Sequence, residues 1–251
     1  MLNAWYKLQP MKMLSLAIGL LLCFSAFAQM DTPYEDGVYA WGFKGGATYH
    51  RIDEVATTII PPFFSPDTYS TSVEPQLGYV GGIFFHYRFG GVSRIALQPE
   101  ILYGLLSSRF SYSDVDELEY QIDFNYQYLQ VGTFVKVYLT GDREGGLQLN
   151  GGLQLAFNTS NEQIYYDSNR PDIGPNLQIQ QNLRNVLKGE TLLNLGAGLG
   201  YDFVGGLSIS ARYFYGLSDA IETQANGYFF IENDNPTQTF QLSLAYAIPF
   251  R

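Results

Sequence analysis

The sequence predicts an all-β protein, an eight-stranded antiparallel up-and-down transmembrane β-barrel with short periplasmic turns and long external loops. Three observations predict it. From Leu193 to Leu217, apolar residues alternate with glycine or polar residues on both sides of a Val204-Gly205-Gly206 turn, which is the pattern of a β-hairpin with one apolar face. The same alternation recurs in six other stretches of the chain. The connections between these stretches are alternately long and short, as in transmembrane barrels.

Eight stretches carry the alternation. They are residues 41–49, 77–89, 95–106, 128–139, 147–158, 193–203, 207–217 and 240–250. Each strand of the central hairpin has about the 9 to 11 residues that a tilted strand needs to cross a bilayer. In the first strand, Trp41 and Tyr49 lie on the apolar side and Lys44 lies on the other. Pro99 removes a hydrogen-bond donor from the third strand, so a β-bulge is expected there.

The connections differ in length in a regular way. Long ones follow the first, third, fifth and seventh strands, over residues 50–75, 111–125, 159–191 and 218–236, and short turns follow the second, fourth and sixth. Because transmembrane barrels have short periplasmic turns and long external loops, both termini are expected in the periplasm. In the longest connection, apolar residues at helical spacing predict a short amphipathic helix over residues 179–188.

The first residues have the pattern of a secretory signal peptide. Lys12 supplies a positive n-region, residues 14–24 supply an apolar h-region, and Ala26-Phe27-Ala28 is a cleavage site of small residues. The mature chain is therefore expected to begin at Gln29. Met11 and Met13 are more ordinary starts than Met1, which would make residues 1–10 a mis-assigned extension.

This cleavage divides the chain into a signal peptide (residues 1–28), a short periplasmic segment (29–40) and the barrel (41–251). Cys23, the single cysteine, is lost with the signal, so no disulfide is expected in the mature chain. Loss of Lys7 and Lys12 leaves 12 basic and 24 acidic residues and a net charge of −12. Such a charge disfavours binding to nucleic acid.

Composition also favours a membrane protein. Only 15% of the residues are charged, and 16% are aromatic, including 20 tyrosines. After residue 28 no run of about 18 apolar residues occurs, so spanning must be done by strands in a closed barrel. A soluble lipocalin-like barrel would fit the alternation with its apolar face inside. The density of leucine and aromatic residues opposite glycine, glutamine and asparagine favours the membrane alternative.

Five segments are similar to a known family. They are GFKGG at 42–46, LQPEILY at 97–103, YLQVGTFVKVY at 128–138, GLGYDF at 198–203 and LSISARYFYGL at 207–217. Through them the chain resembles the PorT-type outer-membrane β-barrel family of the Bacteroidetes. The resemblance implies a barrel in the bacterial outer membrane; the family is broad, and one founding member takes part in a protein-secretion system. The sequence departs from the family pattern at Gln130 and Gly132, where a carboxylate and a proline are usual, and at the terminal Arg251.

Six charged residues fall on inward-facing positions of the predicted strands. They are Lys44, Arg88, Glu100, Lys136, Asp202 and Arg212. An eight-stranded barrel has an interior just wide enough for side chains, and charges excluded from water must be paired. We therefore expect a polar network centred on Glu100, with Lys136 or Arg212 as its partner, that closes the lumen. A lumen that conducts, as in a small passive porin, is the alternative.

Two apolar groups in the predicted external loops are candidate contacts for a partner protein. They are Ile179, Leu183, Val186 and Leu187 in the predicted helix, and Tyr228, Phe229 and Phe230 in the last loop. Packing over the barrel mouth would explain these residues equally well. The acidic loops are expected to form a solvated face, with cation bridging to lipopolysaccharide as the lesser alternative. No spacing resembles a calcium loop or a zinc site, so no metal or cofactor is expected.

The sequence thus favours a non-enzymatic outer-membrane barrel, a structural or binding subunit of a cell-envelope assembly. Its expected partners are outer-membrane lipid, lipopolysaccharide and larger outer-membrane or periplasmic proteins. An outer-membrane acyl hydrolase is the rival class, since such barrels carry serine, histidine and a carboxylate at the rim. Only two histidines are available. His86 is expected to point inward, and His50 to begin a loop with no serine and acid at motif spacing.

Overall fold

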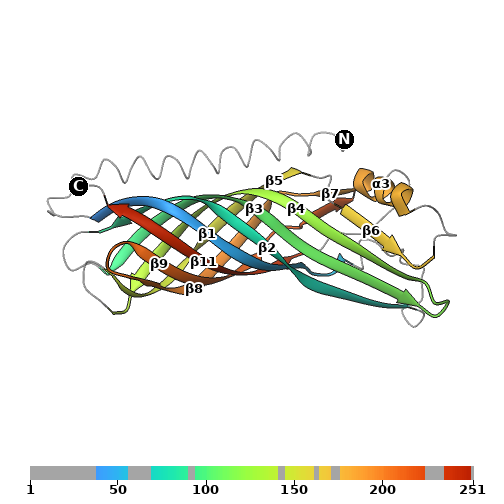
Figure 1. Ribbon diagram of the computed structural model, residues 1–251, viewed down its shortest axis with the longest axis horizontal. Helices are drawn as coiled ribbons and strands as arrows, with labels where there is room; N and C mark the ends of the chain where they lie inside the picture. The colour runs from blue at the N-terminus through green and yellow to red at the C-terminus, as the bar shows by residue number, and fades with distance from the viewer. Residues whose placement is uncertain are drawn as a thin grey trace, which may run out of the picture. The chain divides into compact units, whose positions relative to one another are not determined.

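A computed structural model describes residues 38–55, 69–89, 94–140, 145–160, 164–170, 176–223 and 235–249. Eight antiparallel strands form a closed ring, each paired with its neighbours in the order of the chain (Figure 1). They are β1 (Val38–Ile52), β2 (Tyr69–Arg88), β3 (Ile95–Asp114), β4 (Glu119–Tyr138), β5 (Gly146–Ser160), β8 (Leu192–Asp202), β9 (Leu207–Gly216) and β11 (Thr237–Pro249). Pairing of β1 with β11 closes the ring, so the predicted fold class is confirmed.

The expected signal peptide, the segment 29–37 and the aromatic residues Tyr228, Phe229 and Phe230 lie outside the described residues. Strand β1 begins at Val38, three residues before the predicted boundary at Trp41. Among the described residues, no helix has both the length and the hydropathy to span a membrane.

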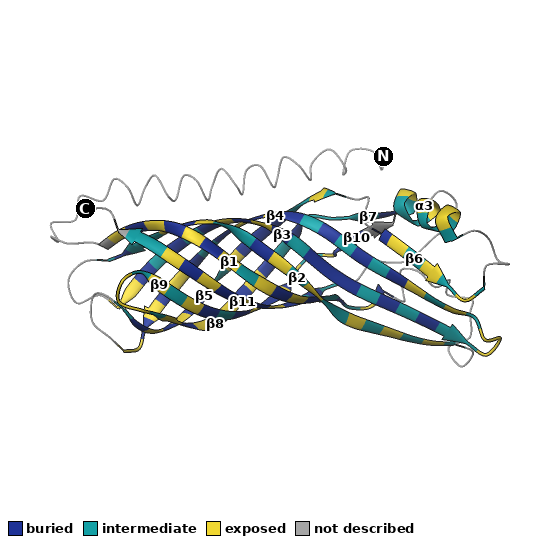
Figure 2. Cartoon of the chain, in the orientation of Figure 1, coloured by how far each residue is buried: buried dark blue, intermediate teal, exposed yellow. Residues whose placement is uncertain are grey.

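The strands expose their apolar side chains and bury their polar ones. Figure 2 shows buried and exposed residues alternating along the strands. Phe43 on β1 is 54% exposed, whereas Lys44 beside it is 4% exposed. Leu244 on β11 is 58% exposed, and its neighbour Ser243 is 2% exposed. This wall, apolar outside and polar inside, suits a lipid environment, and it is the reverse of what a lipocalin-like barrel requires.

Three strands are longer than membrane crossing requires. Strands β2, β3 and β4 each have 20 residues, about twice the length of a tilted spanning strand. The prediction of loops over residues 50–75 and 111–125 is therefore wrong in part: β2 begins at Tyr69, and only residues 115–118 separate β3 from β4. We call this sheet, residues 69–75, 109–114 and 119–123 with β6 (Ile164–Ser168) beside β4, the strand extension.

Proline affects the strands differently from expectation. On one side, Pro99 is paired with Thr133 of β4 in a register that is unbroken along the whole strand. On the other side, the pairs Phe84–Glu100 and Tyr87–Leu97 between β2 and β3 have the same register before and after Pro99. The β-bulge expected at Pro99 is therefore absent. The register shift lies between Pro75 and Tyr79 of β2. An interrupted ladder is therefore enough to accommodate Pro99, without an extra residue.

A helix and a small sheet lie in the connection between β5 and β8. The predicted helix is confirmed, but as α3 (Asn176–Val186); Leu187 and Lys188 belong to β7 (Leu187–Gly189), which pairs with β10 (Ile221–Thr223). Side chains of α3 bond the free edge of β6. Gln180 Oε1 accepts from the Tyr166 N–H at 3.2 Å, and Arg184 Nε donates to the Ile164 carbonyl at 3.0 Å. These bonds cover an edge that could otherwise pair with another chain.

An apolar core fills the barrel at the end opposite the short turns. We call it the end cluster; its buried members are Ile52, Val55, Leu106, Phe110, Tyr112, Ile122, Phe124, Tyr126, Tyr128, Ala156, Ile164, Leu187, Leu192, Ala220 and Ile221. Neighbouring strands, β7 and β10 all contribute to it. Leu183 and Val186 of α3 pack against its margin. The long strands and the long connections therefore share one core.

Replacing Gly196 with valine is expected to lower the free energy of unfolding by about 1–3 kcal/mol, because a Cβ there would lie 2.7 Å from the Phe214 ring and 3.1 Å from the Phe134 ring. The measurement is urea unfolding in phospholipid vesicles, followed by tryptophan fluorescence. The control is Gly151→Ala on the outer wall, where the nearest atom to a new Cβ is 3.7 Å away. Equal destabilisation by both substitutions would contradict the steric explanation.

Candidate functional site

The carboxylate of Glu100 on β3 lies inside the barrel and is 2% exposed. Lys44 Nζ on β1 lies 2.9 Å from Glu100 Oε2 and 3.1 Å from Oε1. Arg212 Nη1 on β9 lies 2.9 Å from Oε1 and 2.8 Å from Oε2 of the same carboxylate. Gln98 Nε2 also donates to Oε1. One buried carboxylate thus accepts from two cations and an amide, which supplies the partners that a buried charge requires.

Arg212 connects this carboxylate to two further strands. Its Nε donates to Asn150 Oδ1 on β5 at 2.7 Å, and its guanidinium carbon lies 3.9 Å from the centre of the Phe134 ring on β4. The polar contacts and the ring therefore join β1, β3, β4, β5 and β9 across the lumen. Strands that are not neighbours in the ring are held together by side chains alone.

A second ionic group lies nearer the short turns. Lys136 Nζ on β4 is 3.2 Å from Asp202 Oδ2 on β8, and the Tyr138 hydroxyl donates to the same oxygen at 2.5 Å. The guanidinium carbon of Arg88 lies 4.1 Å from the centre of the Tyr138 ring. The charges at this level are therefore also engaged by protein groups.

Amide side chains occupy the next level toward the end cluster. Gln154 Nε2 donates to Gln130 Oε1 at 3.1 Å, and Asn194 Nδ2 donates to Gln154 Oε1 at 3.4 Å. The cavity beside these amides has a volume of about 10 Å³, enough for a single water molecule. Ionic groups, amides and the end cluster thus follow one another along the lumen.

All six predicted lumen residues lie on the inner side of the wall, but the pairing differs from expectation. Of the two partners expected for Glu100, Arg212 contacts it and Lys136 contacts Asp202 instead. The second partner is Lys44. Alternation of inward and outward residues can identify these side chains, but it contains no information on which of them lie at the same height in the barrel.

The apolar residues of the predicted helix are only partly available to a partner. Leu183 and Val186 pack against the end cluster, and Leu187 is 3% exposed within it. Ile179 is half-buried. Of the two explanations, packing over the barrel mouth is thus the one that the described residues favour.

Both histidines lie on strands of the barrel. His50 lies within β1, not at the start of a loop, and is 2% exposed; its Nδ1 is 2.7 Å from Thr239 Oγ1. His86 lies on β2 and is half-buried. Among the described residues, no three histidine, cysteine, aspartate or glutamate side chains are grouped as a metal ion would require.

The family described as outer membrane protein beta-barrel domain matches residues 27–222 of the chain. The chain belongs to this family. It is therefore an outer-membrane β-barrel protein, and its place is the bacterial outer membrane. No curated protein matches the chain significantly.

Several solved structures are similar to this outer-membrane barrel. Ail of Yersinia pestis, solved with the heparin analogue sucrose octasulfate, is 14% identical, with 84% of this chain and 99% of that chain covered and a TM-score of 0.34. The outer membrane enzyme PagL is 12% identical, with 85% and 100% covered and a TM-score of 0.36. OprG from Pseudomonas aeruginosa is 10% identical, with 84% and 95% covered and a TM-score of 0.36.

Proposed function

We propose that this protein is a non-enzymatic outer-membrane barrel with a closed lumen, acting as a structural or binding subunit of a cell-envelope assembly. The observation that carries the proposal is the cross-lumen network of Lys44, Glu100 and Arg212. A porin keeps a water-filled channel, whereas here buried ion pairs, amides and aromatic rings occupy the interior at successive levels. Such an interior supports rigidity of the wall rather than passage of solutes.

The proposal includes an orientation and a cellular setting. With a signal peptide over residues 1–28 and short turns on the periplasmic side, both termini are periplasmic and the strand extension faces outward. Lipid and lipopolysaccharide surround the wall, and larger envelope proteins are its partners. The resemblance to the PorT-type family supports a bacterium of the Bacteroidetes and a secretion system as the assembly.

Purified protein in planar bilayers is expected to show no steady conductance, because buried ion pairs, amides and aromatic rings occupy the lumen. Single-channel recording, with a porin added to the same bilayer as a positive control, measures this. Stable current steps that scale with the amount of inserted barrel would contradict the closed lumen and favour the porin alternative.

The assembly role needs a separate experiment, because a silent barrel need not have partners. A mild-detergent pull-down from native membranes, with mass spectrometry, would identify proteins that accompany the barrel in fixed proportion. If the barrel is recovered alone under conditions that keep other envelope complexes intact, the subunit role is contradicted. The protein would then be a structural membrane protein without a fixed partner.

A further inference from the structure

The outer face of the strand extension carries polar side chains in register across neighbouring strands. Ser72 on β2 pairs with Ser111 on β3, Ser111 pairs with Gln121 on β4, and Gln121 pairs with Asp167 on β6. Because directly paired residues point to the same face of a sheet, these four side chains form one row. A second row, one step further from the barrel, contains Ser70, Ser113 and Glu119.

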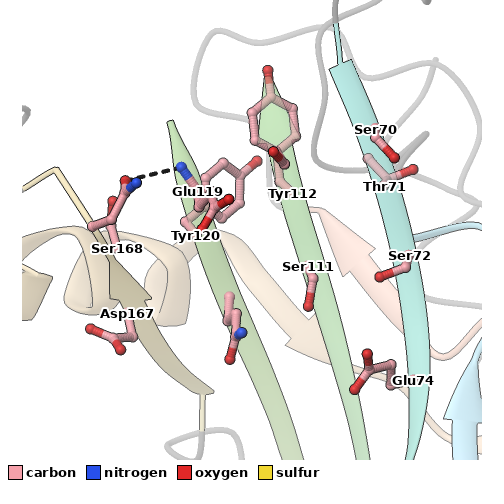
Figure 3. Close-up of a pocket in the computed structure, with 13 residues that line it drawn as sticks. Ser70, Thr71, Ser72, Glu74, Ser111, Tyr112, Glu119, Tyr120, Asp167 and Ser168 are labelled. Carbon is pink, nitrogen blue, oxygen red and sulfur yellow. Dashed lines mark hydrogen bonds between the residues drawn. The ribbon is translucent and has the colours of Figure 1, made fainter. Parts of the chain in front are cut away.

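These rows line a concave site with a volume of about 530 Å³ (Figure 3). The volume is within the range of pockets that bind small molecules, about 300–1,000 Å³. The lining residues on the outer face are four serines (Ser70, Ser72, Ser111 and Ser113), the amides of Gln121 and Asn169, and the carboxylates of Glu74, Glu119 and Asp167. The other four residues that border the site, Thr71, Tyr112, Tyr120 and Ser168, form a row on the opposite face, where Tyr112 belongs to the end cluster. No lysine, arginine or aliphatic residue is among the described lining residues. Every type of side chain in this lining can exchange hydrogen bonds with a ligand.

Part of this hydrogen-bonding capacity is unused. The side chains of Ser72, Ser111 and Gln121 make no hydrogen bond to another described residue. The neighbouring Arg109 is already bound by Asp123, with contacts of 2.6 and 3.0 Å, and this bonding raises the pKa of the Arg109 guanidinium. Other lining groups are already engaged: Asp167 Oδ1 accepts from Asn176 Nδ2 at 3.1 Å, and the Asn169 amide bonds the backbone of Glu117 and Glu119. Among the described residues, the site therefore offers the hydroxyls of Ser72 and Ser111 and the amide of Gln121, and no lysine or arginine lines it.

Several classes of ligand fit this lining poorly. Three carboxylates repel sulfated, phosphorylated or nucleic acid ligands. The three carboxylates are not grouped around one point as a metal ion would require, since no group of metal-ligating side chains is found among the described residues. A protein partner would need an apolar centre to its interface, and the lining has no aliphatic residue. A ligand rich in hydroxyl groups and without negative charge remains.

An exposed aromatic ring lies beside the site. Tyr165 is 52% exposed and stands two residues before Asp167 on β6, so both point to the same face. The guanidinium carbon of Arg184 lies 5.6 Å from the centre of this ring. Tyr165 is paired with Asp123 of β4, which is paired with Arg109 of β3. Arg109 is in turn paired with Glu74 of β2, so these four residues form a further row on the same face. A tyrosine offers an apolar ring with a polar tip, which suits the apolar face of a sugar ring.

We propose that the outer face of the strand extension binds an uncharged oligosaccharide. Ser72, Ser111 and Gln121 exchange hydrogen bonds with its hydroxyl groups, the carboxylates accept from them, and Tyr165 contacts a ring at the margin. The inference rests on the outward orientation and the binding role proposed above and adds a ligand class to them. Its test uses purified protein, so a failure here is separate from a conducting lumen or a missing envelope partner.

The test is isothermal titration calorimetry of the full barrel in detergent with a trisaccharide of N-acetylglucosamine. Gln121→Ala is expected to weaken binding about three- to tenfold, the effect of one lost hydrogen bond. Ser111→Tyr, which fills the site, should weaken it by about tenfold or more. The matched control is Gln181→Ala at an exposed position of α3, which should bind like the wild type.

A fully sulfated disaccharide and polylysine complete the experiment. The sulfated sugar is expected not to bind, because the carboxylates repel it. Absence of trisaccharide binding, or equal binding by wild type and Ser111→Tyr, would overturn the proposal. So would equal affinity for the sulfated sugar. Polylysine that binds and displaces the trisaccharide would overturn it in favour of a basic protein partner.

Discussion

Replacement of Glu100 by alanine is expected to lower the free energy of unfolding by about 3–5 kcal/mol. The carboxylate accepts from Lys44, Arg212 and Gln98, and both cations are almost fully buried. Its loss leaves two positive charges in the lumen without a counter-charge, which costs more than the pair itself contributes. Urea unfolding in phospholipid vesicles measures the change, since Trp41 on the outer wall reports on insertion through its fluorescence.

Two further variants distinguish lost pairing from a general effect of removing a glutamate. Glu74→Ala, at an exposed position on the strand extension, should change the unfolding free energy by less than about 0.5 kcal/mol. A triple variant, Lys44→Met, Glu100→Leu and Arg212→Met, should recover most of the stability, because it removes all the unpaired charges together. If Glu100→Ala unfolds with its midpoint at the same urea concentration as the wild type, the network does not stabilise the barrel.

Much of this barrel is predictable because its physics is local. Alternation with period two places Lys44, Glu100 and Arg212 inside and Phe43 outside, without any knowledge of the neighbouring strands. The turn at Gly205 and Gly206, whose φ angles are positive, is likewise readable from the residues. Strand number and the face of each side chain follow from such short-range signals.

Pairing across the lumen is not local. Glu100 and Arg212 lie on strands that are not neighbours in the ring, so their contact depends on strand tilt and stagger all around the barrel. The sequence therefore indicates which charges are inside, but it does not distinguish Arg212 from Lys136 as the partner of Glu100. For the same reason it identifies Lys44 as an inward residue without assigning it a partner.

The extension of β3 and β4 escapes prediction because acidic residues hide the alternation. Asp114, Asp116 and Glu117 resemble a solvated loop, and they do form the turn, where Asp114 Oδ1 accepts from the N–H groups of Asp116 and Leu118. On either side, Phe110 and Tyr120 continue the strand pattern inward. The apolar residues on one face decide the structure, while the polar residues on the other face set the surface chemistry.

Replacement of Phe110 by alanine is expected to lower the free energy of unfolding by about 3–5 kcal/mol, the usual range for a fully buried phenylalanine. Phe110 is 0% exposed at the centre of the end cluster, where β3 pairs it with Val73 and Ile122. The urea dependence of protease cleavage in the strand extension gives the magnitude, because Trp41 lies on the barrel wall and not in the extension. Leu177→Ala on α3, where the side chain is 65% exposed, should change stability by less than about 0.5 kcal/mol.

The position of the loss within the chain is also expected to be specific. Phe110 holds the strand extension, whereas the Glu100 network holds the barrel wall, so Phe110→Ala should speed protease cleavage in the extension while the barrel still migrates as a folded band on unheated gels. Glu100→Ala should weaken the folded band itself. If Phe110→Ala instead weakens the folded band, and speeds cleavage of the extension no more than Glu100→Ala does, the end cluster is part of the barrel's cooperative core. The extension would then have no separate stability, because a site that opens only with the whole barrel has the barrel's unfolding free energy.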